Sequence, residues 1–113
     1  MFRLFFGKAG EKLAADYLKK KGYKIICCNY RSFAGEVDII AEIDNILVFI
    51  EVKRRVGELF GKGYEAVRGL KKRRIIRTAQ VYLNTLSSTP PCRFDVISID
   101  DGAITHIENA FTA

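Results

Sequence analysis

The strongest constraint on the fold is a run of five apolar residues, Ile46 to Ile50, that leads directly into Glu51-Val52-Lys53. Strands with one exposed face alternate apolar and polar residues, whereas strands covered on both faces are apolar at nearly every position. The run therefore predicts a strand in the centre of a sheet, and it requires other elements to cover both faces of that sheet.

The flanking segments can supply those elements. Residues 8–21 and about 64–86 have apolar side chains at helical spacing, and Gly22 is expected to end the first helix. Strands are expected at 23–30, 36–43, 46–53, 93–99 and 103–108, with Asp44-Asn45 as a two-residue hairpin turn. The order αβββαββ, without repeats or a long linker, predicts one α/β domain over residues 1–113, a mixed sheet flanked by helices. The buried side of the second helix is expected to comprise Val67, Leu70, Ile75, Ala79, Leu83 and Leu86.

Composition limits the class of protein. A chain of 113 residues with 49% hydrophobic residues is long enough for one domain with a core. The apolar start, Met1 to Phe6, is short and is followed at once by charged residues, so neither a signal peptide nor a membrane span is expected. The odd number of cysteines argues against a disulfide framework, and none has zinc-site spacing. We therefore expect a cytoplasmic protein.

The positive charge is concentrated in one part of the chain. The net charge is +6, yet the segment from Lys53 to Arg77 alone holds ten Lys and Arg against two acidic residues. A concentrated basic segment suits a polyanion, because each neutralised phosphate releases condensed counterions. The segment favours nucleic acid as a partner, and the alternative is a solvated basic helix face.

Acidic and basic side chains are expected to face one another across two strands. With a turn at residues 44 and 45, Asp38 falls opposite Glu51, and Glu36 falls opposite Lys53. Directly opposed residues have Cβ atoms about 4.5–5.5 Å apart, which allows two carboxylates to share one cation. Carboxylates in apolar surroundings need a partner or a metal, and oxygen ligands favour Mg²⁺ or Mn²⁺ over zinc. The alternative is an ordinary salt-bridged ladder between Glu36 and Lys53.

Two motifs stand out, Gly-Glu-Val-Asp-Ile-Ile at residues 35–40 and Val-Phe-Ile-Glu-Val-Lys-Arg-Arg at residues 48–55. Together they resemble the PD-(D/E)xK nuclease superfamily, in its Holliday-junction-resolvase-like branch. More closely, the chain resembles the YraN-like family of small bacterial proteins over nearly its full length. This wider resemblance also rests on residues 10–14, 29–31, 60–61, 66–67, 71–74, 93–96 and 107–111.

The resemblance implies a restriction-endonuclease-like fold with an αβββαβ core and a metal-dependent active site. In the superfamily, the Asp and the Glu of these motifs bind Mg²⁺ together with one backbone carbonyl. Those positions correspond here to Asp38, Glu51 and the carbonyl of Val52. The motif lysine, Lys53 here, is implied to orient the attacking water and to stabilise charge on the phosphate.

The resemblance also implies roles for two further acids. Glu11 matches the first-helix Glu of resolvase-like members, which touches the metal through water; alternatively, it is an exposed acid that favours the helix dipole. Glu36 is implied to support the site or to help a second metal. Val37 stands where the superfamily has a proline, and that loss is common in this branch.

Other polar residues have simpler interpretations. Lys71, Arg74 and Arg77 share one side of the second helix by their spacing, whereas Lys72 and Arg73 diverge. On the strand that follows, Arg93 and Asp95 are expected to form a structural pair, and His106 is expected at the surface or in a cap. The candidate phosphate-binding residues are Arg54, Arg55, Lys71, Arg74 and Arg77.

These observations favour a Mg²⁺-dependent endonuclease acting on DNA, with branched or junction DNA as the substrate by analogy. The alternative is a nucleic-acid-binding protein that keeps the nuclease fold with little or no cleavage. A third reading is a protein-interaction adaptor that uses the apolar N-terminus. Junction resolvases cut two strands symmetrically as dimers, so a homodimer through the Met1 to Phe6 patch or a sheet edge is a reasonable expectation.

Overall fold

The predicted element order αβββαββ is confirmed. The computed structural model describes residues 10–55 and 69–113, and no helix among them is long and apolar enough to cross a membrane. The Met1 to Phe6 patch, Val67 and the expected starts of both helices lie outside the described residues. The elements are α1 (Glu11–Lys20), β1 (Lys24–Ser32), β2 (Gly35–Ile43), β3 (Ile46–Arg55), α2 (Gly69–Leu83), β4 (Cys92–Asp100) and β5 (Ala103–Phe111).

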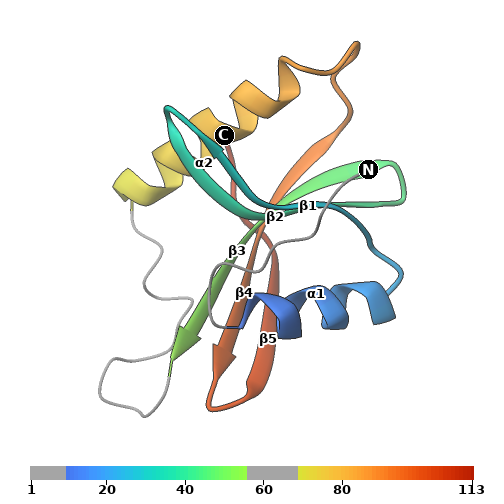
Figure 1. Cartoon of the computed structure of the whole chain (residues 1–113), viewed down its shortest axis with the longest axis vertical. Helices are drawn as coiled ribbons and strands as arrows, with labels where there is room; N and C mark the ends of the chain where they lie inside the picture. Colours follow the sequence, from blue (N-terminus) through green and yellow to red (C-terminus); the bar gives the residue numbers. More distant parts are fainter. Residues whose placement is uncertain (1–9, 56–68) are drawn as a thin grey trace.

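The strands form one mixed sheet in the order β1-β2-β3-β4-β5. Neighbouring strands are antiparallel except β3 and β4, which are parallel and are separated in the chain by α2. The apolar run lies in β3, at the centre of the sheet, and Val48, Phe49 and Ile50 are fully buried. This is a restriction-endonuclease-like αβββαβ core with β5 added at one edge (Figure 1).

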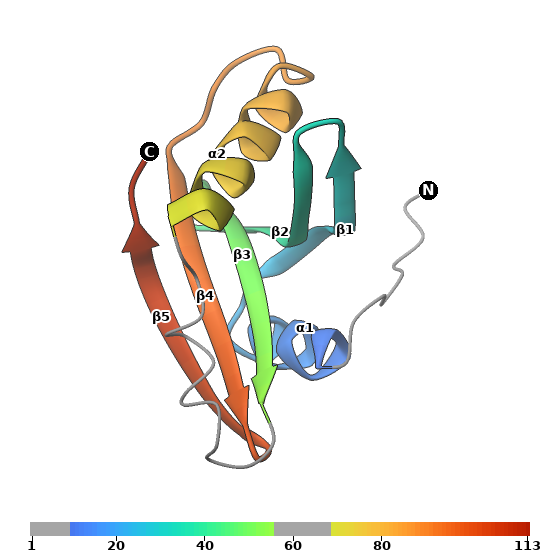
Figure 2. The same cartoon turned by 90° about the vertical axis from the view of Figure 1, so that its left-hand side faces the viewer.

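The two helices cover opposite faces of the sheet (Figure 2). Leu18 of α1 packs in one core cluster with Val48, Ile50 and Val52. The other cluster joins Ile75 and Ala79 of α2 to Leu47 and Phe49. Because strand side chains alternate between faces, the odd-numbered residues from Leu47 to Lys53 face α2. Glu51 and Lys53 are therefore on the α2 side of the sheet.

The placement of Leu70 on the buried side of the second helix was wrong. Leu70 is 56% exposed, whereas Ile75 and Ala79 are buried. Ile75 is five positions after Leu70, and this step turns the two side chains about 140° apart around the helix axis.

The turn between β2 and β3 establishes the predicted register. Asp44 and Asn45 both have positive φ, 50° and 64°, as the favoured two-residue hairpin turns require. The ladder that follows pairs Ile43 with Ile46 and ends with Ile39 opposite Ile50. Beyond that pair the two strands carry no further ladder partners.

A buried polar network joins β4 to β5. Asp95 is fully buried and accepts hydrogen bonds from Arg93 Nε at 2.9 Å and from the Asn109 backbone N–H at 3.0 Å. His106 Nε2 lies 2.7 Å from Asp95 Oδ2, and the His106 side chain is only 3% exposed. The expected Arg93–Asp95 pair is confirmed, whereas the expectation that His106 lies at the surface or in a cap was wrong.

Candidate active site

Asp38 lies where β2 separates from β3. Its side chain is 1% exposed, and its Oδ2 accepts a hydrogen bond of 2.8 Å from the backbone N–H of Val52. The ladder of backbone pairs between β2 and β3 ends at Ile39 and Ile50. The Asp38 carboxylate supplies the next hydrogen bond between the two strands. This bond holds the Asp38 carboxylate against the peptide that joins Glu51 to Val52, although the ladder that would set Asp38 opposite Glu51 ends one pair before them.

Glu51 is a buried carboxylate within reach of two ammonium groups. Only 2% of its side chain is exposed, and its Oε1 lies 3.0 Å from Lys71 Nζ and 3.7 Å from Lys53 Nζ. Burying an unpaired carboxylate costs several kcal/mol, and two lysines on the same oxygen offset that cost. The lysine side chains are 18% (Lys53) and 37% (Lys71) exposed, so both are partly open to solvent.

The sequence analysis missed the partnership of Lys71 with Glu51. Lys71 was grouped with Arg74 and Arg77 as a phosphate-binding residue, but it projects from the first turn of α2 toward β3. Its spacing to the buried residues Ile75 and Thr78 places it on their side of the helix, which was the available signal.

Glu11 is buried on the opposite face, at the start of α1. It is 0% exposed, and its Oε1 accepts a hydrogen bond of 2.8 Å from Asn29 Nδ2, so the exposed-acid alternative was wrong. Gly10 precedes it with φ 93°, and a Cβ there would lie 3.3 Å from Arg54 Cδ and 3.1 Å from Ile99 Cδ1. The glycine therefore lets α1 begin directly against the ends of β3 and β4. Asn29 was not singled out from the sequence.

The Cys28 thiol is close enough to both Glu11 and Asp38 for their charges to affect its pKa. Burial, aided by the nearby negative charges of Glu11 and Asp38, raises the pKa of the Cys28 thiol to about 11. A thiol of this kind stays protonated and is not a nucleophile at neutral pH. Cys27, Cys28 and Cys92 are all free.

Glu36 has a different partner from the expected one. The ladder between β2 and β3 ends before Glu36 and Lys53, so these two residues are not paired across the strands as predicted. Instead, Glu36 pairs with Arg31 of β1, whose Nε donates a hydrogen bond of 2.6 Å to Glu36 Oε2. The cause is the separation of β2 from β3 at Asp38, which leaves β1 as the neighbour of Glu36.

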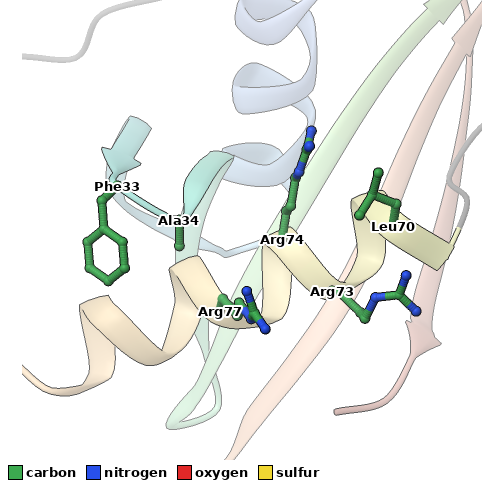
Figure 3. A pocket seen from close by; sticks show the side chains of 6 residues that line it. All are labelled: Phe33, Ala34, Leu70, Arg73, Arg74 and Arg77. Carbon is green, nitrogen blue, oxygen red and sulfur yellow. The ribbon is translucent and has the colours of Figure 1, made fainter.

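The basic residues divide into separate groups. Arg54 is exposed near the end of β3, and Arg55 is its last residue. Lys72 Nζ lies over the Phe111 ring, 5.8 Å from its centroid. Arg73, set apart by spacing in the sequence analysis, lines one groove together with Arg74 and Arg77 (Figure 3).

The described side chains form no larger cage for a cation. Within residues 10–55 and 69–113, no three His, Cys, Asp or Glu side chains come together as a metal cluster. Mg²⁺ commonly binds through one or two carboxylates and completes its shell with water and substrate phosphates. Asp38 and Glu51 fit that mode of binding, and zinc, which takes His and Cys, does not suit these donors.

Comparisons with known proteins agree with the resemblance to the YraN-like family. Residues 10–99 match the model of the uncharacterised protein family UPF0102, the YraN-like family. A UPF0102 protein of Thermodesulfovibrio yellowstonii is 50% identical over 98% of this chain and 99% of its own length. Another, of Symbiobacterium thermophilum, is 46% identical over 95% of this chain and 96% of its own.

Proposed function

The chain belongs to the uncharacterised protein family UPF0102, and we propose that it is a Mg²⁺- or Mn²⁺-dependent endonuclease of the PD-(D/E)xK superfamily that cleaves DNA. The observation that carries the proposal is the buried Glu51 carboxylate, held by Lys53 and Lys71 beside the peptide that Asp38 binds. Two buried acids repel phosphate, so a surface that only binds nucleic acid does not need them. A nuclease needs both the acids and the lysines.

Each group has a role in this proposal. Asp38, Glu51 and the Val52 carbonyl would hold the cation, which activates water and polarises the scissile phosphate. Lys53 orients the attacking water and stabilises negative charge that develops on the phosphate. Lys71 neutralises Glu51 in the metal-free protein, and its ammonium group is then available to a phosphate oxygen. Glu11, held by Asn29, supports the site from the α1 side.

The substrate, assembly and location follow by analogy with the superfamily. Branched or junction DNA is the proposed substrate, and a homodimer would allow two strands to be cut symmetrically. Arg54, Arg55, Arg74 and Arg77 are proposed to contact phosphates outside the catalytic centre. Three free cysteines suit the cytoplasm, where such a nuclease would meet DNA.

The second candidate is a nucleic-acid-binding protein that has the fold without the activity. One observation favours it: among the described residues, no three His, Cys, Asp or Glu side chains come together as a metal cluster. Such a protein would bind DNA equally well with and without a divalent cation.

The test of the proposal is a cleavage assay with the purified full chain. Single-stranded, duplex, flap and four-way DNA are incubated with Mg²⁺, with Mn²⁺ or with EDTA at several salt concentrations. We expect at least one substrate to be nicked or cut in the presence of the cation and none in EDTA. Binding of these substrates without any cleavage by a folded protein would exclude the nuclease and favour the second candidate.

A second prediction concerns the competition between Lys71 and the cation. Lys71→Met removes a positive charge 3.0 Å from the Glu51 oxygen, so Mn²⁺ should bind about tenfold more tightly in calorimetry without DNA. Lys72→Met is the matched control, because Lys72 lies over Phe111 and is expected to leave the Mn²⁺ affinity unchanged. If both variants bind Mn²⁺ as the wild type does, Glu51 is not a ligand of the cation.

A further inference from the structure

A fully exposed aromatic ring stands at the tip of the β1–β2 hairpin. Phe33 is 96% exposed, which is unusual for a large apolar side chain on a folded domain. Its ring borders a groove of about 400 Å³, whose other lining residues are Ala34 of the same turn and Leu70, Arg73, Arg74 and Arg77 of α2 (Figure 3).

The hairpin tip is fixed against α2. A Cβ on Gly35 would lie 3.2 Å from Thr78 Oγ1 and 3.4 Å from Arg74 Cβ, so only a glycine lets the strand approach the helix this closely. The turn itself is closed by a hydrogen bond of 3.0 Å from the Ala34 N–H to Ser32 Oγ. Phe33 is therefore presented by a defined turn, with its ring toward solvent.

The positive charge of the groove favours an anionic ligand. Arg73, Arg74 and Arg77 are exposed, and none of the three forms an ion pair with another residue of the described ranges. No acidic residue of the described ranges lines the groove. A ligand with regularly spaced negative charges and flat apolar groups would satisfy both the guanidinium groups and the ring.

The groove and the candidate active site share α2. Lys71, which contacts Glu51, lies three residues before Arg74 and six before Arg77 on α2. At 1.5 Å per residue, these steps correspond to about 4.5 Å and about 9 Å along the helix. At about 100° per residue, Arg74 and Arg77 are also turned about 60° and about 120° around the helix from Lys71, so a nucleic-acid backbone that passes from Glu51 to the groove would wrap partly around α2.

We propose that this groove binds unpaired nucleotides next to the cleavage site, with Phe33 stacking on a base and the arginines holding the phosphates. Bases in a continuous duplex are already stacked on their neighbours, whereas unpaired bases are free to stack on an aromatic side chain. The inference rests on the proposed nuclease function and deepens it. Its substrate class is DNA with a single-stranded segment, such as a flap, a bubble or an open junction.

The test is DNA binding measured in EDTA by fluorescence anisotropy, with the full chain. The probes are a labelled single strand and the blunt duplex that contains it. Phe33→Ala should weaken binding of the single strand by about tenfold and binding of the duplex by less than about twofold. Phe33→Tyr should restore single-strand binding, and Leu13→Ala is the matched control, because Leu13 is also exposed, at 51%, but belongs to α1.

A base analogue that loses fluorescence on stacking supplies a direct readout. 2-Aminopurine in the single strand should be quenched by the wild type and by Phe33→Tyr, and not by Phe33→Ala. Equal losses on single strand and duplex, or no loss in Phe33→Ala, would overturn the proposal. Phe33-dependent binding to anionic phospholipid vesicles in place of DNA would also overturn it.

The outcomes separate this inference from the proposed function. Cleavage that depends on Glu51 but is indifferent to Phe33→Ala would reject the groove and keep the nuclease. Phe33-dependent binding of single strands without any cleavage would keep the groove and reject the nuclease. A chain that binds no DNA would reject both.

Discussion

Glu51→Ala is expected to abolish the metal-dependent cleavage of DNA, with a fall of about a thousandfold or more. The substitution removes one of the two carboxylates that would hold the cation and leaves Lys53 and Lys71 without the oxygen they share. Loss of a catalytic cation removes several kcal/mol of charge stabilisation from the transition state, and each 1.4 kcal/mol corresponds to about tenfold in rate. The measurement is the initial rate of cleavage on the preferred substrate, at saturating Mg²⁺.

Two controls make this result interpretable. Glu51→Gln keeps the size of the side chain and removes its charge, so it should be equally inactive while folding as the wild type does by circular dichroism. Glu42→Ala removes another carboxylate of β2, near the end of the β2–β3 ladder that is away from the site. It should retain cleavage within about twofold of the wild-type rate. Activity that survives Glu51→Ala would come from a contaminant, and the assignment of the site would then be wrong.

The fold could be predicted because its signals are local. The apolar run of β3 required a central strand, and the pair Asp44-Asn45 determined both the turn and the register between β2 and β3. Within the described residues, the predicted strands overlap the observed ones, with differences at their ends. No signal of this kind marks where two paired strands separate, so the separation of β2 from β3 at Asp38 was not expected.

The site was predicted only in part because its remaining contacts join distant segments. Asp38 and Glu51 come from one hairpin, and their spacing in the sequence already placed them together. The contacts of Glu11 with Asn29 and of Glu51 with Lys71 depend on how each helix is rotated against the sheet. A helical pattern identifies the apolar face, but it does not say which polar residue at the edge of that face reaches a strand.

The network around Asp95 supports the second large prediction, a loss of stability. Asp95→Ala should lower the free energy of unfolding by about 3 kcal/mol and the melting temperature by about 12 °C. The substitution leaves the Arg93 guanidinium, whose side chain is only 17% exposed, without its buried partner. It also removes the acceptor for the Asn109 N–H, at the point where the β4–β5 register shifts. Thermal and urea unfolding, followed by circular dichroism, measure the loss.

The matched control is the outer partner of the same arginine. Glu108 Oε1 lies 3.3 Å from Arg93 Nη1, but its side chain is 54% exposed, so Glu108→Ala should cost less than about 1 kcal/mol. Similar losses of stability in Asp95→Ala and Glu108→Ala would contradict the prediction, because they would show that the burial of Asp95 does not make its loss more costly.

The pH dependence of stability separates the charge of Asp95 from its packing. Burial alone would raise the pKa of this carboxyl, but hydrogen bonds from His106, Arg93 and the Asn109 N–H outweigh it and lower the pKa below 3.8. Above that value the unfolded carboxyl is also ionised, so the charge contributes its full stabilisation; below it, the unfolded state takes up a proton first and the stabilisation is lost. The stability difference between wild type and Asp95→Asn should therefore be largest near neutral pH and should narrow as the pH falls below about 4. A difference that stays constant down to the acid transition would show that the shape of the Asp95 side chain, and not its charge, holds β5 to β4.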